Sequence, residues 1–179
     1  MFTFKLKSLV VLFGFLLAIP NISFAYFTTG QTATKINENT LLYTVSYKFN
    51  FGKNGGRMPI GAVRGLEFGT SSPYVGYDLL QDSETPVTVE ESYSVVLSNA
   101  KVVDNEYYVP PGQTASFILV ALVHLPPNFV PESTRDYDLS LQVTSLPFTI
   151  LSEEKEFKNQ LNPSELQYYL TPEIDIKVR

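Results

Sequence analysis

Apolar and polar residues alternate along much of the chain after residue 25, which is the pattern of half-buried β-strands. The clearest example is segment 41–51, where one set of alternate positions is aromatic or aliphatic and the other set is largely polar. We expect the first set to face the core: Tyr43, Val45, Tyr47, Phe49 and Phe51. Asn and Gly residues border this segment, so the sequence predicts chain reversals at residues 37–39 and 53–56.

Further segments alternate in the same way and are predicted to be strands: residues 28–36, 86–97, 101–103, 107–109, 137–143 and 174–178. In segment 86–97 the alternation groups six residues on one face: Val87, Val89, Glu91, Tyr93, Val95 and Leu97. Because a carboxylate is rarely buried, we expect Glu91 at an exposed strand end or an open sheet edge. Asp104 and Asn105 predict a hairpin turn.

Segment 114–125 differs because it is apolar on both faces. One face would carry Ala115, Phe117, Leu119, Ala121 and Val123, and the other Ile118, Val120 and Leu122. We therefore expect a central strand that is covered on both faces. Residues 126–136 follow, rich in proline and too long for a tight turn, and a loop of this length is often functional.

The C-terminal part contains one helix signal. Asn162 fits a helix cap, Pro163 lies in the first turn, and Glu165 can reach back to the cap. The apolar face of this helix would be Leu166, Tyr169 and Leu170. We expect a short helix that ends before residues 171–172, whereas residues 152–161 fit either a short charged helix or an extended segment.

About eight or nine short strands with frequent turns predict an all-β fold, an antiparallel β-sandwich with one short C-terminal helix. Residues 109–117, Val109-Pro110-Pro111-Gly112-Gln113-Thr114-Ala115-Ser116-Phe117, resemble the turn and strand entry of many bacterial immunoglobulin-like modules. The resemblance covers less than a tenth of the chain, and the cysteine pair and core tryptophan of antibody domains are absent. It implies only the general architecture, an immunoglobulin-like or jelly-roll sandwich.

Residues 1–25 have the three parts of a secretory signal peptide. Two lysines precede an apolar run at residues 9–19, and Ser23 and Ala25 supply small side chains before the predicted cleavage site. The run is shorter than the roughly 20 residues of a membrane-spanning helix, so we expect cleavage and no membrane span afterwards. The prediction is one domain, residues 26–179, that is secreted, periplasmic or on the cell surface.

Composition excludes several kinds of chemistry. The chain has no cysteine, no tryptophan and one histidine, which rules out disulfides, thiolate metal sites and cysteine nucleophiles. The formal net charge is −5, and it becomes −7 when the two signal lysines are removed. Because an acidic surface repels polyanions, we expect no nucleic-acid partner. No glycine loop that could cradle phosphate precedes a helix, and we predict no cofactor.

Candidate catalytic and metal-ligating residues are few. His124 ends the most apolar segment without a G-x-S-x-G motif, so we expect a structural histidine. Nearly all candidate acid/base carboxylates lie beside predicted turns or on polar faces: Glu90, Glu91, Asp136, Asp138, Glu153, Glu154 and Glu156. The possible calcium ligands lack the spacing of known calcium loops: Asp78, Asp82, Glu84, Asp136 and Asp138. We predict neither catalytic nor metal-ligating residues.

Aromatic residues give the strongest functional signal. Tyr107 and Tyr108 are adjacent, so one of them must point outward from a strand, and Phe129 lies in the proline-rich loop. We expect Tyr107, Tyr108 and Phe129 to form an interaction surface for a protein or a cell-surface component. The predicted function is protein binding, adhesion or surface structure without catalysis. Two alternatives stay open: a small outer-membrane β-barrel and a carboxylate-based hydrolase on a jelly-roll scaffold.

Overall fold

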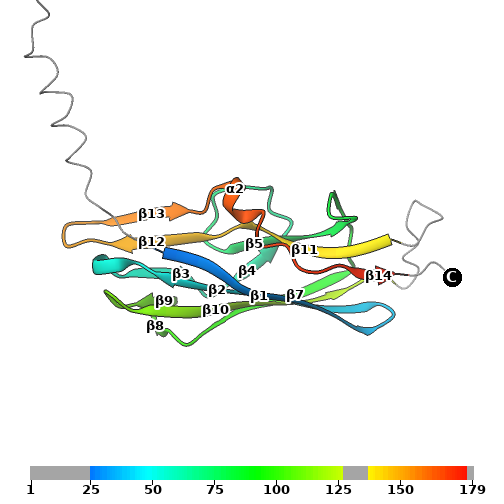
Figure 1. The fold of residues 1–179 in the computed structure, drawn as a ribbon, viewed down its shortest axis with the longest axis horizontal. Coiled ribbons are helices and arrows are strands. Elements are labelled where there is room, and N and C mark those ends of the chain that lie inside the picture. Colours follow the sequence, from blue (N-terminus) through cyan, green and yellow to red (C-terminus); the bar gives the residue numbers. More distant parts are fainter. Residues whose placement is uncertain (1–24, 127–136, 177–179) are drawn as a thin grey trace, which may run out of the picture.

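Three β-sheets form the fold of residues 25–126 and 137–176, which are the residues that the computed structural model describes. Their fourteen strands build an all-β sandwich, which confirms the predicted fold class (Figure 1). Sheet A forms one layer and is antiparallel, in the order β1–β2–β10–β7. Its strands are β1 (Ala25–Asn37), β2 (Thr40–Asn50), β10 (Thr114–His124) and β7 (Glu91–Ser98).

The other two sheets face the inner side of sheet A. Sheet C has the strand order β14–β11–β5–β4, and β6 (Thr85–Pro86) is paired to β5. Its other strands are β14 (Ile174–Ile176), β11 (Tyr137–Ser145), β5 (Val75–Gln81) and β4 (Ala62–Arg64). Sheet B, in the order β13–β12–β3–β9–β8, comprises β13 (Glu156–Gln160), β12 (Pro147–Leu151), β3 (Gly56–Pro59), β9 (Glu106–Val109) and β8 (Lys101–Val103). Because β12 follows β11 directly, the two sheets lie end to end along the long axis (Figure 1).

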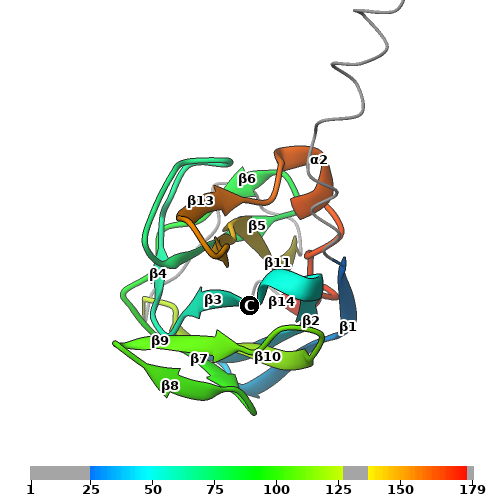
Figure 2. The same ribbon diagram turned by 90° about the vertical axis from the view of Figure 1, so that its left-hand side faces the viewer.

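The inner face of β2 joins the layers. All five residues predicted to face the core are fully buried: Tyr43, Val45, Tyr47, Phe49 and Phe51. The hydroxyl of Tyr43 donates a hydrogen bond to the carbonyl oxygen of Leu139 in β11, at 3.1 Å. Farther along β2, the rings of Phe49 and Phe148 in β12 lie 5.5 Å apart. One strand therefore contacts sheet C with one end and sheet B with the other, and in Figure 2 sheet B extends from β13 to β8 across the end of the molecule.

The predicted turns are confirmed. β1 and β2 form a hairpin, and η1 (Gly52–Asn54) with Gly55 at φ 70° leads the chain from β2 into β3. Asp104 and Asn105, at φ 51° and 61°, close the β8–β9 hairpin. Residues 152–161 form the turn and second strand of the β12–β13 hairpin, so this segment is extended and not helical.

The face predicted for segment 86–97 is wrong in its second half. Val87 and Val89 are buried, each 7% exposed, but from β7 onward the inward residue is Val96. The residues that point outward are Tyr93, Val95 and Leu97. The cause is a change of sheet, because the Val87 N–H donates to the carbonyl oxygen of Leu79 in β5, at 2.9 Å, whereas β7 pairs with β10. The alternation therefore restarts in β7 with the opposite face inward.

β10 is central in sheet A, between β2 and β7, as predicted. Its inner residues are buried: Ala115, Phe117, Leu119, Ala121 and Val123. The predicted cover over its second face is wrong for the described residues, since Ile118 is 37% exposed and Val120 and Leu122 are half-buried. β10 therefore brings aliphatic side chains to the outer surface of the sandwich.

The C-terminal helix α2 (Pro163–Leu166) begins as predicted. The carboxylate of Glu165 accepts a hydrogen bond from the backbone N–H of Asn162, at 2.7 Å. The helix ends earlier than predicted because Leu170 forms an isolated β-bridge with Gln142 of β11. Pairing to the sheet thus replaces the last helical turn that the sequence pattern suggested.

The strand β1 begins at Ala25, the residue before the predicted cleavage site. Residues 1–24 lie outside the described ranges, so the signal peptide stays a prediction. Within the described ranges, no helix has the length and apolar character needed to cross a membrane.

Candidate interaction surface

The outer surface of sheet A carries two facing rows of apolar side chains. Leu97 of β7 is paired with Ile118 of β10, and the next pairs on the same face of the ladder are Val95 with Val120 and Tyr93 with Leu122. Directly opposed residues of an antiparallel ladder project from the same side of the sheet. We call these six residues the outer apolar face: Tyr93, Val95, Leu97, Ile118, Val120 and Leu122.

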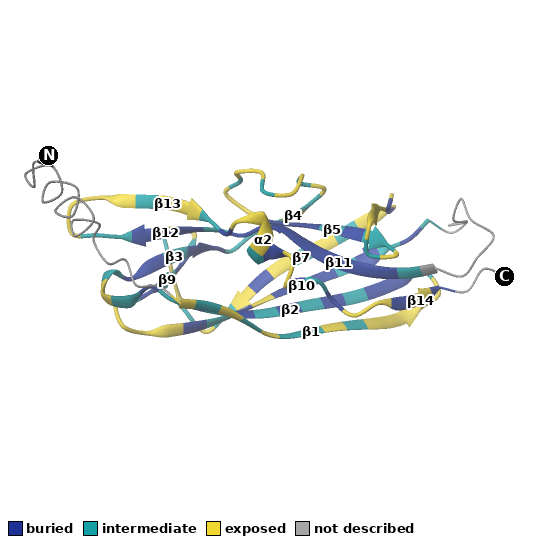
Figure 3. Ribbon diagram, turned by 45° about the horizontal axis from the view of Figure 1, so that its top comes forward, coloured by how far each residue is buried: buried dark blue, intermediate teal, exposed yellow. Residues whose placement is uncertain are grey.

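Four of the six side chains are well exposed. The exposed fractions are 59% for Tyr93, 48% for Leu97, 40% for Val95 and 37% for Ile118. Along β10 exposed or half-buried positions alternate with buried ones, and along β7 exposed positions alternate with half-buried ones or with the buried Val96 (Figure 3). Single exposed apolar residues are normal on proteins, whereas a contiguous group is a candidate interaction site. The six residues are therefore the strongest candidate surface in the described part of the chain.

Polar contacts hold one end of this face in place. The Tyr93 hydroxyl donates to Oε2 of Glu91 at 2.8 Å, and this hydrogen bond, with the carboxylate charge, raises the pKa of the phenol. The Tyr93 ring meets the His124 ring edge to face, with centroids 6.2 Å apart. His124 Nδ1 lies 3.1 Å from the hydroxyl of Thr40. Glu91 is exposed at the start of β7, as expected, and His124 makes the structural contacts of a strand-end histidine.

Of the three residues predicted as an interaction surface, the structure describes Tyr107 and Tyr108. Tyr107 is only 8% exposed, and its hydroxyl donates to the carbonyl oxygen of Val96 at 2.8 Å, so it belongs to the core and not to the surface. Tyr108 is half-buried and lines a groove of about 320 Å³ beside Pro110. Phe129 lies outside the described residues. The expectation that one tyrosine of the pair points outward is met by Tyr108.

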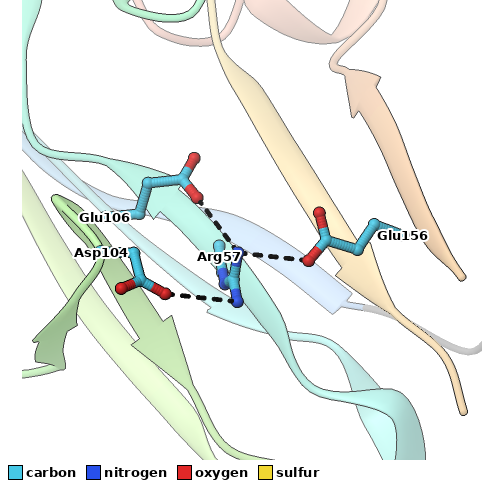
Figure 4. A network of polar contacts seen from close by, with 4 residues as sticks. All are labelled: Arg57, Asp104, Glu106 and Glu156. Atoms are coloured by element: carbon cyan, nitrogen blue, oxygen red, sulfur yellow. Dashed lines mark ion pairs between the residues drawn. The ribbon is translucent and has the colours of Figure 1, made fainter.

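Arg57 of β3, which is opposite Tyr108 in the ladder, forms ion pairs with three carboxylates (Figure 4). The closest nitrogen–oxygen distances are 3.2 Å to Glu156, 3.8 Å to Glu106 and 4.0 Å to Asp104. These acids come from β13, β9 and the β8–β9 turn, so the guanidinium links both flanks of sheet B to its central strand. Its charge is thereby compensated within the fold, and we interpret the cluster as structural.

A second groove, of about 510 Å³, lies over sheet B beside the loop Ser71–Pro73. Its described lining includes Lys158, Asn159 and one carboxylate, Glu106, which is ion-paired with Arg57. Glycoside hydrolysis in its usual form needs two carboxylates on either side of the substrate. The groove therefore lacks, among its described lining, the pair that the hydrolase alternative requires.

Four carboxylates gather where β5, β11 and β14 meet: Asp82, Asp138, Glu173 and Asp175. Asp82 and Asp138 are joined by two hydrogen bonds, since the Asp82 N–H donates to the Asp138 carbonyl at 2.8 Å and the Asp82 side-chain Oδ1 accepts from the Asp138 N–H at 3.2 Å. Partial burial, followed by the charges of Glu173, Asp175 and Asp82, raises the pKa of Asp138. Among the described residues, no three histidine or acidic side chains are placed to hold a metal ion.

The raised pKa predicts that Asp138 lowers stability at neutral pH. The folded chain binds this proton more tightly than the unfolded chain, so the contribution of Asp138 is most favourable at low pH and is lost as pH rises through the raised pKa. We expect Asp138→Asn to raise the melting temperature at pH 7 by about 1–3 °C. High salt should reduce the gain because it screens exposed charges.

Differential scanning fluorimetry at low and high salt tests this prediction. Glu153→Gln, which removes one negative charge from the exposed β12–β13 turn, is the matched control and should change the melting temperature less. A lower melting temperature for Asp138→Asn would contradict the expected repulsion.

Comparisons with known proteins add no relative: no protein family matches the chain, and no curated protein is similar to it in sequence. The class of the protein therefore rests on its fold, an all-β sandwich. The immunoglobulin-like resemblance has no support from sequence comparison.

Proposed function

We propose that this chain is an exported, non-enzymatic β-sandwich module that works by binding another protein, in adhesion or as part of a surface structure. The observation that carries the proposal is the outer apolar face, three cross-strand pairs of apolar side chains on the exterior of sheet A. Burial of such a surface against a partner releases water and is the main favourable term in protein association. The signal peptide predicted from the sequence supports export.

The chemistry of the face favours a protein partner with an apolar patch of its own. Tyr93 adds a large ring whose hydroxyl is already bonded to Glu91, so little side-chain entropy is lost when a partner covers it. The net charge of −5 favours approach by basic rather than acidic partners.

The contacts of the titratable residues support binding without turnover. His124 is bonded to Thr40, with no serine hydroxyl among its described hydrogen-bond partners. Burial raises the pKa of Asp78, the carboxylate of which lies 3.7 Å from Arg64 and accepts the Leu79 N–H. Each of these groups already has a structural partner in the fold.

Substitution of the face should weaken binding without unfolding the protein. In the variant Val95→Ser/Leu97→Ser, two exposed aliphatic side chains become small and polar while the core face of β7 is unchanged. We expect half-saturation of the surface of the producing cells to need about 5–30-fold more protein, equivalent to about 1–2 kcal/mol. Titration of fluorescently labelled protein onto these cells measures this change.

Val102→Ser is the matched control, because Val102 is 51% exposed on β8 and lies outside the outer apolar face. This variant should bind like the wild type, and the melting temperatures of all three proteins should agree within a few degrees. Equal cell binding by the wild type and a folded Val95→Ser/Leu97→Ser variant would remove this face from the binding surface.

A further inference from the structure

The edge strand β1 offers unpaired backbone to another chain. β1 is thirteen residues long, lies at the border of sheet A and pairs with β2 alone. Among the described backbone hydrogen bonds, residues 30–35 bond only to β2. Exposed and half-buried residues follow one another along its length (Figure 3). An edge with free N–H and C=O groups is a template for a further strand.

Residues 30–34 have none of the features that usually protect an edge. They contain no charge and no proline: Gly30, Gln31, Thr32, Ala33 and Thr34. The bulge-like shifts in register lie at the borders of this run, between Thr28 and Gly30 and between Lys35 and Asn37. The side chain of Gln31 is used within the fold, since its Nε2 donates to the Tyr168 carbonyl at 2.9 Å, but the backbone of this run has no described hydrogen-bond partner other than β2. Its border side can therefore accept a partner strand.

The other sheet borders are shorter, charged or already used. β4, β8 and β14 have three residues each, and β13 has five, with Glu156 and Lys158 among them. The remaining border strand, β7, is partly occupied, since the Val96 N–H donates to the Ile60 carbonyl at 3.2 Å and the Ser94 hydroxyl to the Ala62 carbonyl at 3.2 Å. β1 is thus the border with the longest free run in the described residues.

We infer that β1 pairs antiparallel with β1 of a second copy of this chain. A two-fold axis lets each copy supply the hydrogen-bonding groups that the other lacks, with the same surface used on both. Charge permits a copy at this border, because the only charged residue of β1 is Lys35 although the chain carries −5 overall. The β1–β1 ladder between two such acidic chains would therefore contain no carboxylate.

The register of the pair follows from its symmetry. Directly opposed residues of an antiparallel ladder project from the same side of the sheet. In a symmetric pair of β1 strands, the residue at the two-fold axis therefore lies opposite the same residue of the second copy. With Thr32 or Ala33 at the centre, Lys35 faces Thr29 or Gln31 of the second copy, and both are uncharged. The two lysines are therefore kept apart and the pairing is not opposed by like charges.

The pair would form one continuous eight-stranded sheet, β7–β10–β2–β1 followed by the same strands in reverse order. Because the axis is perpendicular to the sheet, both outer apolar faces would lie on the same side. This pairing is independent of the proposed function, since an association through β1 leaves the outer apolar face of each copy uncovered.

Charge reversal across the axis provides a direct test. Thr32 and Thr34 are exposed, so the variants Thr32→Lys/Thr34→Lys and Thr32→Glu/Thr34→Glu place like charges opposite one another in either register. For protein expressed from the full sequence, sedimentation equilibrium should give a dimer for the wild type and about tenfold weaker association for each variant. An equimolar mixture of the two variants should recover a heterodimer.

Val95→Lys/Leu97→Lys is the matched control, because these exposed residues lie on the same outer surface of sheet A but on β7, at the opposite border. It should dimerise like the wild type, and hydrogen exchange in residues 30–35 should slow as protein concentration rises. A monomeric wild type at all concentrations would overturn the inference. So would dimers that the control weakens as much as the Thr32/Thr34 variants do, because that result would place the contact on the sheet face.

Discussion

Replacement of Phe117 by alanine should lower the free energy of unfolding by about 3–5 kcal/mol. Phe117 is fully buried in β10, and its ring stacks on Tyr47 with centroids 5.6 Å apart and meets Tyr107 edge to face at 5.8 Å. These neighbours belong to the central strand β2 and to β9, so they cannot close around the lost ring without shifting the strands. The cost therefore includes a cavity as well as the lost burial.

Urea denaturation measures this loss as a lower midpoint at an unchanged slope. Ile118→Ala is the control from the next position of the same strand, where the side chain points outward, and it should cost about 1 kcal/mol or less. If Phe117→Ala does not fold, Phe117→Leu keeps most of the volume and should show an intermediate loss. A midpoint for Phe117→Leu equal to that of the wild type would mean that the ring makes no dense contacts.

The sequence predicts which residues of a strand face the core where a single apolar–polar alternation runs through the whole strand. In β2 the five apolar positions and the bordering turns agree with the structure, because the strand stays in one sheet with one face toward the core. Alternation reports which residues share a face, but it does not report that a chain leaves one sheet for another. The segment from Val87 to Leu97 makes such a change, so its second half has the opposite face inward.

The candidate surface was harder to predict because it depends on pairing between distant strands. The aliphatic residues on the second face of β10 were visible in the sequence, and they indicated a covered strand. In the structure this second face is exposed or half-buried, and the outward residues Tyr93, Val95 and Leu97 of the neighbouring strand β7 extend the same apolar area. The apolar residues of both segments were visible in the sequence, but only the register of the pairing places them side by side on one surface.

Tyr107 and Tyr108 show the same limit of prediction from sequence within one short strand. Adjacent residues in a strand point to opposite sides, so one outward tyrosine was predictable. Which of the two is outward depends on the partner that β9 meets. Tyr107 faces Phe117 and the carbonyl of Val96, whereas Tyr108 lies opposite Arg57 in sheet B.

The second large effect is expected for Gly56→Ala in β3, which should lower the free energy of unfolding by about 1–3 kcal/mol. A Cβ atom at residue 56 would lie 2.5 Å from Cγ and Cδ2 of the Phe51 ring, well inside van der Waals contact. The ring cannot retreat easily because it is fully buried, 5.5 Å from Phe49 and 5.9 Å from Phe148 between centroids. The sequence suggested a turn as the reason for this glycine, but the structure gives the close approach of an aromatic ring.

Two further variants separate this clash from a general effect of alanine in a strand. Gly30→Ala in β1 places the new methyl group in open space, with no atom within 4 Å, so it should be neutral or slightly stabilising. Combining Gly56→Ala with Phe51→Leu removes part of the ring that the methyl group meets. The double variant should therefore lose less stability than the two single losses together, by about 0.5–3 kcal/mol in a denaturation cycle. Strict additivity would show that residue 56 and the Phe51 ring do not compete for the same space.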